Sequence, residues 1–271
     1  MNELLTAPFI TTKAHRLFCE FGDACRSNRY IGLCYGVPGI GKTVSAREYA
    51  SWDRVESVMQ QYRLPELPAL PTLLECVTLF YTPSVNVVPT RLEKDLEARI
   101  NQLEEFHYYM QAAIDQQQVL TYPTRKTDVT QLLIIDEADR LKTISLEVIR
   151  DLYDRRHIGV ILIGMPGLEK RLSRYAQFYS RVGFVHHFKP LYQDEIHLIL
   201  QRTWQALALT FDPNTCTEHD ALITILHITQ GNFRLLERLI SQIVRILNVN
   251  QLRTLTRDVI MTARESLIIG V

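Results

Sequence analysis

Residues 36–43 read Gly36-Val37-Pro38-Gly39-Ile40-Gly41-Lys42-Thr43, which matches the phosphate-binding pattern G-x-x-x-x-G-K-[ST]. The preceding residues, 30–35, form a short apolar and aromatic run typical of a buried parallel strand, and residues 43–50 open a helix. In a strand–loop–helix context this pattern wraps backbone N–H groups around the phosphates of a nucleotide. The sequence therefore predicts a site for ATP, contacted by residues 36–44, in which Lys42 reaches the β- and γ-phosphates and Thr43 binds Mg²⁺.

A second stretch, Leu132-Leu133-Ile134-Ile135-Asp136-Glu137, is an apolar strand that ends in two adjacent carboxylates. This arrangement supplies what the glycine loop lacks, because one acid can lie near Mg²⁺ and the other beside the attacking water. We therefore expect one of Asp136 and Glu137 to help hold Mg²⁺ and the other to act on water, and the chain to hydrolyse ATP.

Strands and helices alternate along the first two thirds of the chain. This alternation predicts an α/β fold, a parallel sheet with helices on both faces. Beyond Pro190 the pattern indicates helices alone. We expect a nucleotide-binding domain over residues 1–189 and a helical lid over residues 190–271. The expected strands cover residues 30–35, 76–81, 132–135, 160–164 and 182–188, and the expected helices include 14–27, 43–50, 90–119, 144–154, 193–207, 218–228, 233–247 and 256–267.

The composition is that of an ordinary soluble globular protein. Lys plus Arg and Asp plus Glu number 30 each, so the formal net charge is zero. A neutral chain is poorly suited to bind DNA tightly as a lone monomer, although an assembly can line one surface with a few cations from every subunit. No apolar run approaches the ~20 residues that span a bilayer, and the five scattered cysteines fit reduced thiols. We expect a cytoplasmic protein with no membrane partner.

A phosphate-loop sheet domain followed by a small helical lid resembles the AAA+ ATPases. Within that superfamily the chain is most similar to the transposition ATPases of the TnsC/TniB/MuB group, over nearly its whole length. IstB- and DnaC-like helicase loaders and ExeA-type secretion ATPases share parts of the same pattern. Besides the phosphate loop and Asp136-Glu137, the resemblance depends on residues 11–15, Ala138-Asp139-Arg140-Leu141, Ile163-Gly164-Met165-Pro166 and Gly231-Asn232-Phe233-Arg234.

The resemblance implies that Asp136 helps hold Mg²⁺ and that Glu137 polarises the attacking water. It also implies two arginine roles. Arg234 matches the lid "sensor 2" arginine, which reaches the γ-phosphate within its own subunit; otherwise it is a helix-start arginine paired with a surface acid such as Glu237. Arg181 is the candidate arginine finger, donated to the ATP of a neighbouring subunit, with Arg171 and Arg174 as rivals. A charged residue at a strand start is often simply solvated, and that reading stays open for Arg181.

One position departs from the superfamily pattern. The strand over residues 160–163 should end in a polar "sensor 1" residue able to position water, yet Gly164-Met165 follows. A thioether is a poor hydrogen-bonding group. We therefore expect slow hydrolysis, or water positioned by other groups.

DNA contacts in the resembled group come from two segments. The first holds Thr90, Arg91 and Lys94 here, and the second holds Arg125 and Lys126. Arg91 and Lys94 share a helix face. Acidic residues are interleaved with them, so a solvated, salt-bridged helix is an equal alternative.

The resemblance predicts an ATP-dependent DNA-binding regulator of transposition. Such a protein forms a ring or helical filament on double-stranded DNA, selects the target, and recruits or activates a transposase, together with a target-selection protein. The alternatives are a helicase loader or replication-initiation ATPase, and an ATP-gated scaffold with little turnover.

Overall fold

The computed structural model describes residues 9–117, 128–206, 216–252 and 254–267. It divides into two compact units that interleave along the chain. The sheet unit comprises residues 17–37 and 42–188, and the helical unit comprises residues 1–16, 38–41 and 189–271. The assignment of residues 1–189 and 190–271 to two domains stays a prediction.

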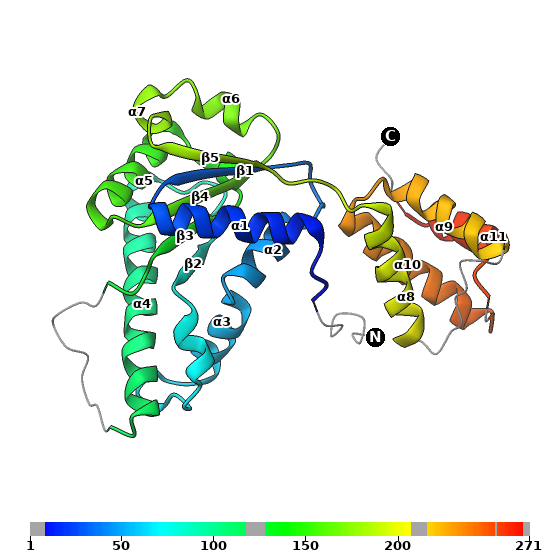
Figure 1. Ribbon diagram of the computed structural model, residues 1–271, viewed down its shortest axis with the longest axis horizontal. Coiled ribbons are helices and arrows are strands. Elements are labelled where there is room, and N and C mark those ends of the chain that lie inside the picture. Colours follow the sequence, from blue (N-terminus) through cyan, green and yellow to red (C-terminus); the bar gives the residue numbers. More distant parts are fainter. Residues whose placement is uncertain (1–8, 118–127, 207–215, 253, 268–271) are drawn as a thin grey trace. The chain divides into compact units, whose positions relative to one another are not determined.

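The sheet unit contains five parallel strands in the order β2-β3-β4-β1-β5. Figure 1 shows them side by side with helices of the same unit along both faces, as the alternating pattern predicted. The central strands β3 and β4 are buried throughout, which explains why they read as continuous apolar runs. The strands are β1 (Ile31–Tyr35), β2 (Thr78–Tyr81), β3 (Leu132–Ile135), β4 (Gly159–Gly164) and β5 (Val182–His187).

The helices around this sheet follow the predicted positions, with three additions. The additions are α3 (Trp52–Gln61), α6 (Leu168–Leu172) and α7 (Ala176–Tyr179). A left-handed Ser51, with φ 49°, separates α3 from the preceding helix, while α6 and α7 are too short to show a helical period. The others are α1 (Lys13–Asn28), α2 (Lys42–Tyr49), α4 (Pro89–Ile114) and α5 (Thr143–Arg156), with short 3₁₀ turns η2 (Leu64–Glu66), η3 (Pro71–Glu75) and η4 (Ala138–Arg140).

The helical unit is built around its own apolar core. Leu200, Trp204, Ile225, Leu239 and Ile243 are buried together in it. All the described elements beyond residue 190 are helices, as expected. They are α8 (Gln193–Ala206), α9 (Cys216–Thr229), α10 (Phe233–Val249) and α11 (Arg257–Glu265). None of the helices in the described ranges is long and apolar enough to cross a membrane.

Candidate functional site

The phosphate loop connects β1 to α2, as its sequence context predicted. Gly39 and Gly41 have φ values of 80° and 101°, a left-handed backbone that glycine adopts without steric cost. Gly39 also lies close to another segment of the helical unit, because a Cβ there would come within 2.6 Å of Asn232 Oδ1. The loop therefore needs glycine at these positions. The nine residues expected to contact nucleotide are Gly36, Val37, Pro38, Gly39, Ile40, Gly41, Lys42, Thr43 and Val44.

Lys42 and Thr43 begin α2 beside the carboxyl ends of the central strands. The Lys42 ammonium is buried and donates to the carbonyls of Gly36, at 2.6 Å, and Val37, at 2.9 Å. Burial lowers its pKa, and this effect is opposed by nearby Cys34, Asp136, Asp139 and Glu137. Lys42 thus sits within reach of several acidic groups at the edge of the sheet.

Asp136 comes directly after β3, where its carboxylate is held by two hydrogen bonds. Its Oδ2 accepts from the Thr43 hydroxyl at 2.7 Å, and its Oδ1 accepts from the Glu137 amide at 2.9 Å. The residue is only 4% exposed. A threonine hydroxyl and a carboxylate far apart in sequence therefore meet at one point. Their assignment to Mg²⁺, which prefers such oxygen ligands, stays a prediction.

Glu137 differs from Asp136 in both exposure and backbone. Its φ of 52° and ψ of 39° place it in the left-handed region, which is uncommon for a residue other than glycine. Its side chain is 49% exposed, and its Oε2 lies 3.8 Å from Arg140 Nη2. Such backbone conformations are concentrated at functional sites, and here the conformation turns the carboxylate out of the core.

A carboxylate for which the sequence predicted no role lies at the end of β4. Asp139, in the turn η4, accepts a hydrogen bond at Oδ2 from the Met165 amide at 2.7 Å. Met165 itself is 39% exposed. The sequence does contain a sign of this position, because Asp139 is the third acid in Asp136-Glu137-Ala138-Asp139. It follows the strand closely enough to lie at the same edge of the sheet.

The predicted Arg234 lies at the start of α10, in the helical unit. Its amide donates to the Gly39 carbonyl at 2.8 Å, and the neighbouring Asn232 donates from Nδ2 to the Pro38 carbonyl at 2.9 Å. The Asn232 side chain also caps α10 by accepting from the Leu235 amide. The start of α10 is therefore hydrogen-bonded to the phosphate-loop residues of the same unit.

The three candidate finger arginines have different environments. Arg181 donates from Nε and Nη2 to the two carboxylate oxygens of Asp154, both at 2.8 Å, and this pairing raises its pKa. Arg171 donates to the carbonyls of Asp139 and Ala138, at 3.0 and 2.9 Å. Arg174 is exposed. Arg171 therefore braces the turn η4 inside its own subunit.

The candidate DNA-contacting residues Thr90, Arg91 and Lys94 lie in the first turns of α4 and are exposed. Arg91 lies 3.6 Å from Asp95, four residues on, which is an ion pair of the kind a solvated helix makes. Arg125 and Lys126 fall outside the described residues.

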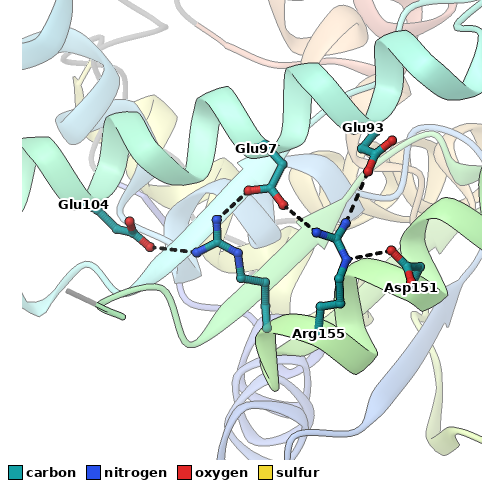
Figure 2. A network of polar contacts seen from close by, with 6 residues as sticks. Glu93, Glu97, Glu104, Asp151 and Arg155 are labelled. Atoms are coloured by element: carbon teal, nitrogen blue, oxygen red, sulfur yellow. Dashed lines mark hydrogen bonds and ion pairs between the residues drawn. The ribbon is translucent and has the colours of Figure 1, made fainter. Parts of the chain in front are cut away.

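Two of the acidic residues interleaved with these cations, Glu93 and Glu97, pair with arginines of α5. Figure 2 shows Arg155 between Glu93, Glu97 and Asp151, while Arg156 reaches Glu97 and Glu104. Glu104 is only 1% exposed, so this network extends from the surface into the interior. Arg155 and Arg156 of α5 therefore pair with three acids of α4.

Comparison with known proteins identifies the family. The family described as "AAA domain" matches residues 25–172, more than half of the chain. The chain belongs to this family.

Two curated proteins are similar to this AAA-domain chain. A "Potential ATP-binding protein" of Staphylococcus aureus is 41% identical over 268 residues, covering 97% of both chains. The "ATP-dependent target DNA activator B" of Escherichia phage Mu is 28% identical over 164 residues, which is 56% of this chain and 42% of the phage protein.

Solved structures share the fold of this AAA-domain chain. The Holliday-junction branch-migration motor RuvB of Thermotoga maritima has a TM-score of 0.58 at 17% identity, covering 97% of this chain and 71% of RuvB. Cdc6p of Pyrobaculum aerophilum has a TM-score of 0.62 at 14% identity, covering 100% of this chain and 72% of Cdc6p. At these identities the likeness concerns the fold alone, and it confirms the parallel AAA+ sheet.

Proposed function

We propose that this protein binds ATP with Mg²⁺ and hydrolyses it. The observation that carries this proposal is the 2.7 Å contact between the Thr43 hydroxyl and the buried Asp136 carboxylate. It joins the end of the phosphate loop to the end of β3 and forms a pair of hard oxygen ligands of the kind Mg²⁺ prefers. Mg²⁺ bound there would neutralise charge on the β- and γ-phosphates.

The neighbouring residues fit the remaining requirements of phosphoryl transfer. Lys42 would exchange its two carbonyl contacts for the β- and γ-phosphates, and the left-handed glycines leave backbone N–H groups free to approach them. Glu137, which is exposed and points away from the core, would orient the attacking water or accept a proton from it. Arg234 would contact the γ-phosphate, as its place beside the loop residues of its own unit favours.

We assign the protein to DNA transposition as an ATP-dependent regulator that assembles on duplex DNA. The support is its similarity to the phage Mu protein, whose name describes an ATP-dependent activator of target DNA. In this account the protein selects the target and recruits or activates a transposase, with a target-selection protein as a further partner. Thr90, Arg91 and Lys94, with Arg125 and Lys126, would contact phosphates, and repetition around a ring or filament would combine these weak contacts.

Arg181 is the proposed trans-acting finger. To reach a neighbouring subunit, Arg181 would have to break its ion pair with Asp154. Assembly of the subunits would therefore be coupled to the loss of this ion pair. Because Arg171 is engaged with the turn η4, Arg174 is the stronger rival. Mixing two inactive variants tests the trans role: Arg181→Ala lacks the finger, and Glu137→Gln keeps it but cannot hydrolyse ATP. Restored turnover on mixing supports Arg181, and no gain contradicts it.

The assembly is tested by retention on duplex DNA and by electron microscopy. With a slowly hydrolysed ATP analogue we expect rings or filaments and salt-sensitive retention, and with ADP we expect neither. The Lys42→Ala variant provides the matched control, which should resemble the ADP state. Monomers that ignore DNA under both conditions would contradict the DNA role.

An ATP-gated scaffold with little turnover is the second candidate, favoured by Met165 at the end of β4. Under that alternative, ATP and its slowly hydrolysed analogue would support assemblies of equal extent and equally long lifetime. Measurable turnover that dissolves the assembly would exclude it.

A further inference from the structure

The end of β4 lacks a polar side chain of its own. Residue 164 is glycine and residue 165 is methionine, whose thioether is a weak acceptor. The Gly164 carbonyl accepts from the Gly36 amide at 3.3 Å, so this strand end lies beside the first residue of the phosphate loop. A group that positions water at this edge has to come from another element.

The carboxylate of Asp139 occupies the space that a side chain at position 164 would enter. A Cβ placed on Gly164 would come within 2.5 Å of Asp139 Oδ2 and 3.1 Å of its Cγ. The same Oδ2 accepts from the Met165 amide at 2.7 Å. A polar group of the right kind is therefore present at the end of β4, supplied by the turn η4.

Arg171 holds the turn that carries this carboxylate, and the carboxylate retains one oxygen for another partner. Arg171 donates to the backbone carbonyls of Asp139 and Ala138, which fixes the turn without neutralising the carboxylate directly. No hydrogen bond from the described residues reaches Asp139 Oδ1. Asp139 also acts electrostatically on Lys42, whose pKa it helps to raise against the lowering caused by burial. It therefore lies within electrostatic range of the lysine proposed to bind phosphate.

We infer that Asp139 is a positioning residue for ATP hydrolysis, in place of the polar side chain missing from the end of β4. It fixes the Met165 backbone through Oδ2 and orients the attacking water through Oδ1. This inference rests on the proposed ATPase function. It accounts for the presence of glycine at position 164, since a larger residue there would displace the carboxylate.

The test exchanges the polar group between the two positions. The variants are Asp139→Ala, Asp139→Asn, Gly164→Ser and the double variant Asp139→Ala/Gly164→Ser. A serine is compatible with the backbone of Gly164, which is not left-handed, although the flexible end of Leu168 must move from 2.8 Å. For each protein, ATP affinity, kcat, KM and thermal stability are measured with and without duplex DNA.

We expect Asp139→Ala to lower kcat by roughly 10²-fold, because the attacking water would no longer be held in position. ATP affinity should change by less than about threefold. Asp139→Asn keeps a hydrogen-bond acceptor and should retain most of the turnover. Gly164→Ser alone should lose turnover, because its side chain collides with Asp139. The double variant should recover at least about tenfold over Asp139→Ala, a non-additive result that two independent sites would not give.

Two results would overturn the inference while leaving the ATPase proposal intact. One is wild-type kcat in Asp139→Ala when Glu137→Gln is inactive. The other is a double variant whose kcat does not exceed that of Asp139→Ala, while kcat across the series follows thermal stability alone. Asp139 would then stabilise the local structure without a role in hydrolysis. A wild-type protein that hydrolyses no ATP, with or without DNA, would instead contradict the proposed function itself.

Discussion

The carboxyl edge of the sheet and the start of α4 both carry charged residues, but the two regions hold them differently. At the sheet edge, Thr43 and Asp136 are brought into contact from distant parts of the chain, and Asp136 is almost completely buried. On α4, Arg91 and Lys94 are exposed, and Arg91 pairs with its helical neighbour Asp95. Polar groups that meet in a buried place indicate a functional site, because burying them costs free energy. An exposed cation contributes little unless a partner binds it.

The largest expected effect concerns the sheet edge. Glu137→Gln should retain ATP binding but lower turnover by roughly 10³-fold, because the amide cannot accept a proton from water. Single-turnover hydrolysis with saturating DNA measures this effect. Glu56→Gln is the control, since it also neutralises one acid but lies on α3, where it pairs with Arg47. Turnover near the wild-type rate in Glu137→Gln would remove this residue from the mechanism.

The second effect separates the buried and exposed ends of the α4–α5 network. Arg156→Ala removes a partner of the buried Glu104 and should lower the free energy of unfolding by about 2–3 kcal/mol. Arg155→Ala, one residue away, breaks pairs with exposed acids and should cost less than about 1 kcal/mol. Denaturant unfolding of both variants measures the difference. Equal losses would mean that burial does not decide the strength of these pairs.

The third effect concerns the exposed cations of α4. Arg91→Ala or Lys94→Ala should weaken duplex DNA binding several-fold and reduce the slope of log affinity against log salt by about one per subunit. ATP binding should stay unchanged in both. Arg63→Ala is the control, because Arg63 is also exposed but lies outside α4. An equal loss of DNA affinity in Arg63→Ala would indicate a general charge effect instead of a contact surface.

The smallest effect is the pH dependence of stability due to His186. Burial lowers its pKa to about 4, and the ring stacks on Phe21 at 5.3 Å between centroids. Because the unfolded histidine has a higher pKa, near 6.5, the unfolded chain binds more protons between these values. Stability should therefore fall as pH drops from about 6.5 to 4, by about 1 kcal/mol for this partly exposed ring. His186→Phe should remove this component from thermal unfolding curves, and an unchanged pH dependence would contradict it.

The sequence was most informative where apolar runs end in polar residues. The phosphate loop and the strand 132–135 led us to assign Thr43 and Asp136 to one Mg²⁺ site, which stays a prediction. The structure brings the two side chains into contact, because carboxyl ends of parallel strands meet at one edge of a sheet. The five strands and the helices beyond residue 190 also agree with the structure. Short helices such as α6 and α7 were missed because they contain too few residues to show a period.

Side-chain partners across the fold could not be predicted from spacing. The pattern marked Met165 as a departure but gave no sign that Asp139 lies against Gly164, since this contact depends on how η4 turns after β3. Likewise, the interleaved acids of α4 indicated a solvated, salt-bridged helix but not its partners, and two of these acids, Glu93 and Glu97, pair with Arg155 of α5. Such contacts join residues through packing, which the one-dimensional pattern does not specify.

The central claim is that the loop and the acidic strand form one site for ATP with Mg²⁺. Equilibrium binding of ATP to wild-type protein and Lys42→Ala, with Mg²⁺ and with a chelator, tests it most directly. We expect saturable binding by the wild type that weakens without Mg²⁺, and a loss of affinity of at least about tenfold in Lys42→Ala. Equal ATP binding by the two proteins, unaffected by Mg²⁺, would contradict it.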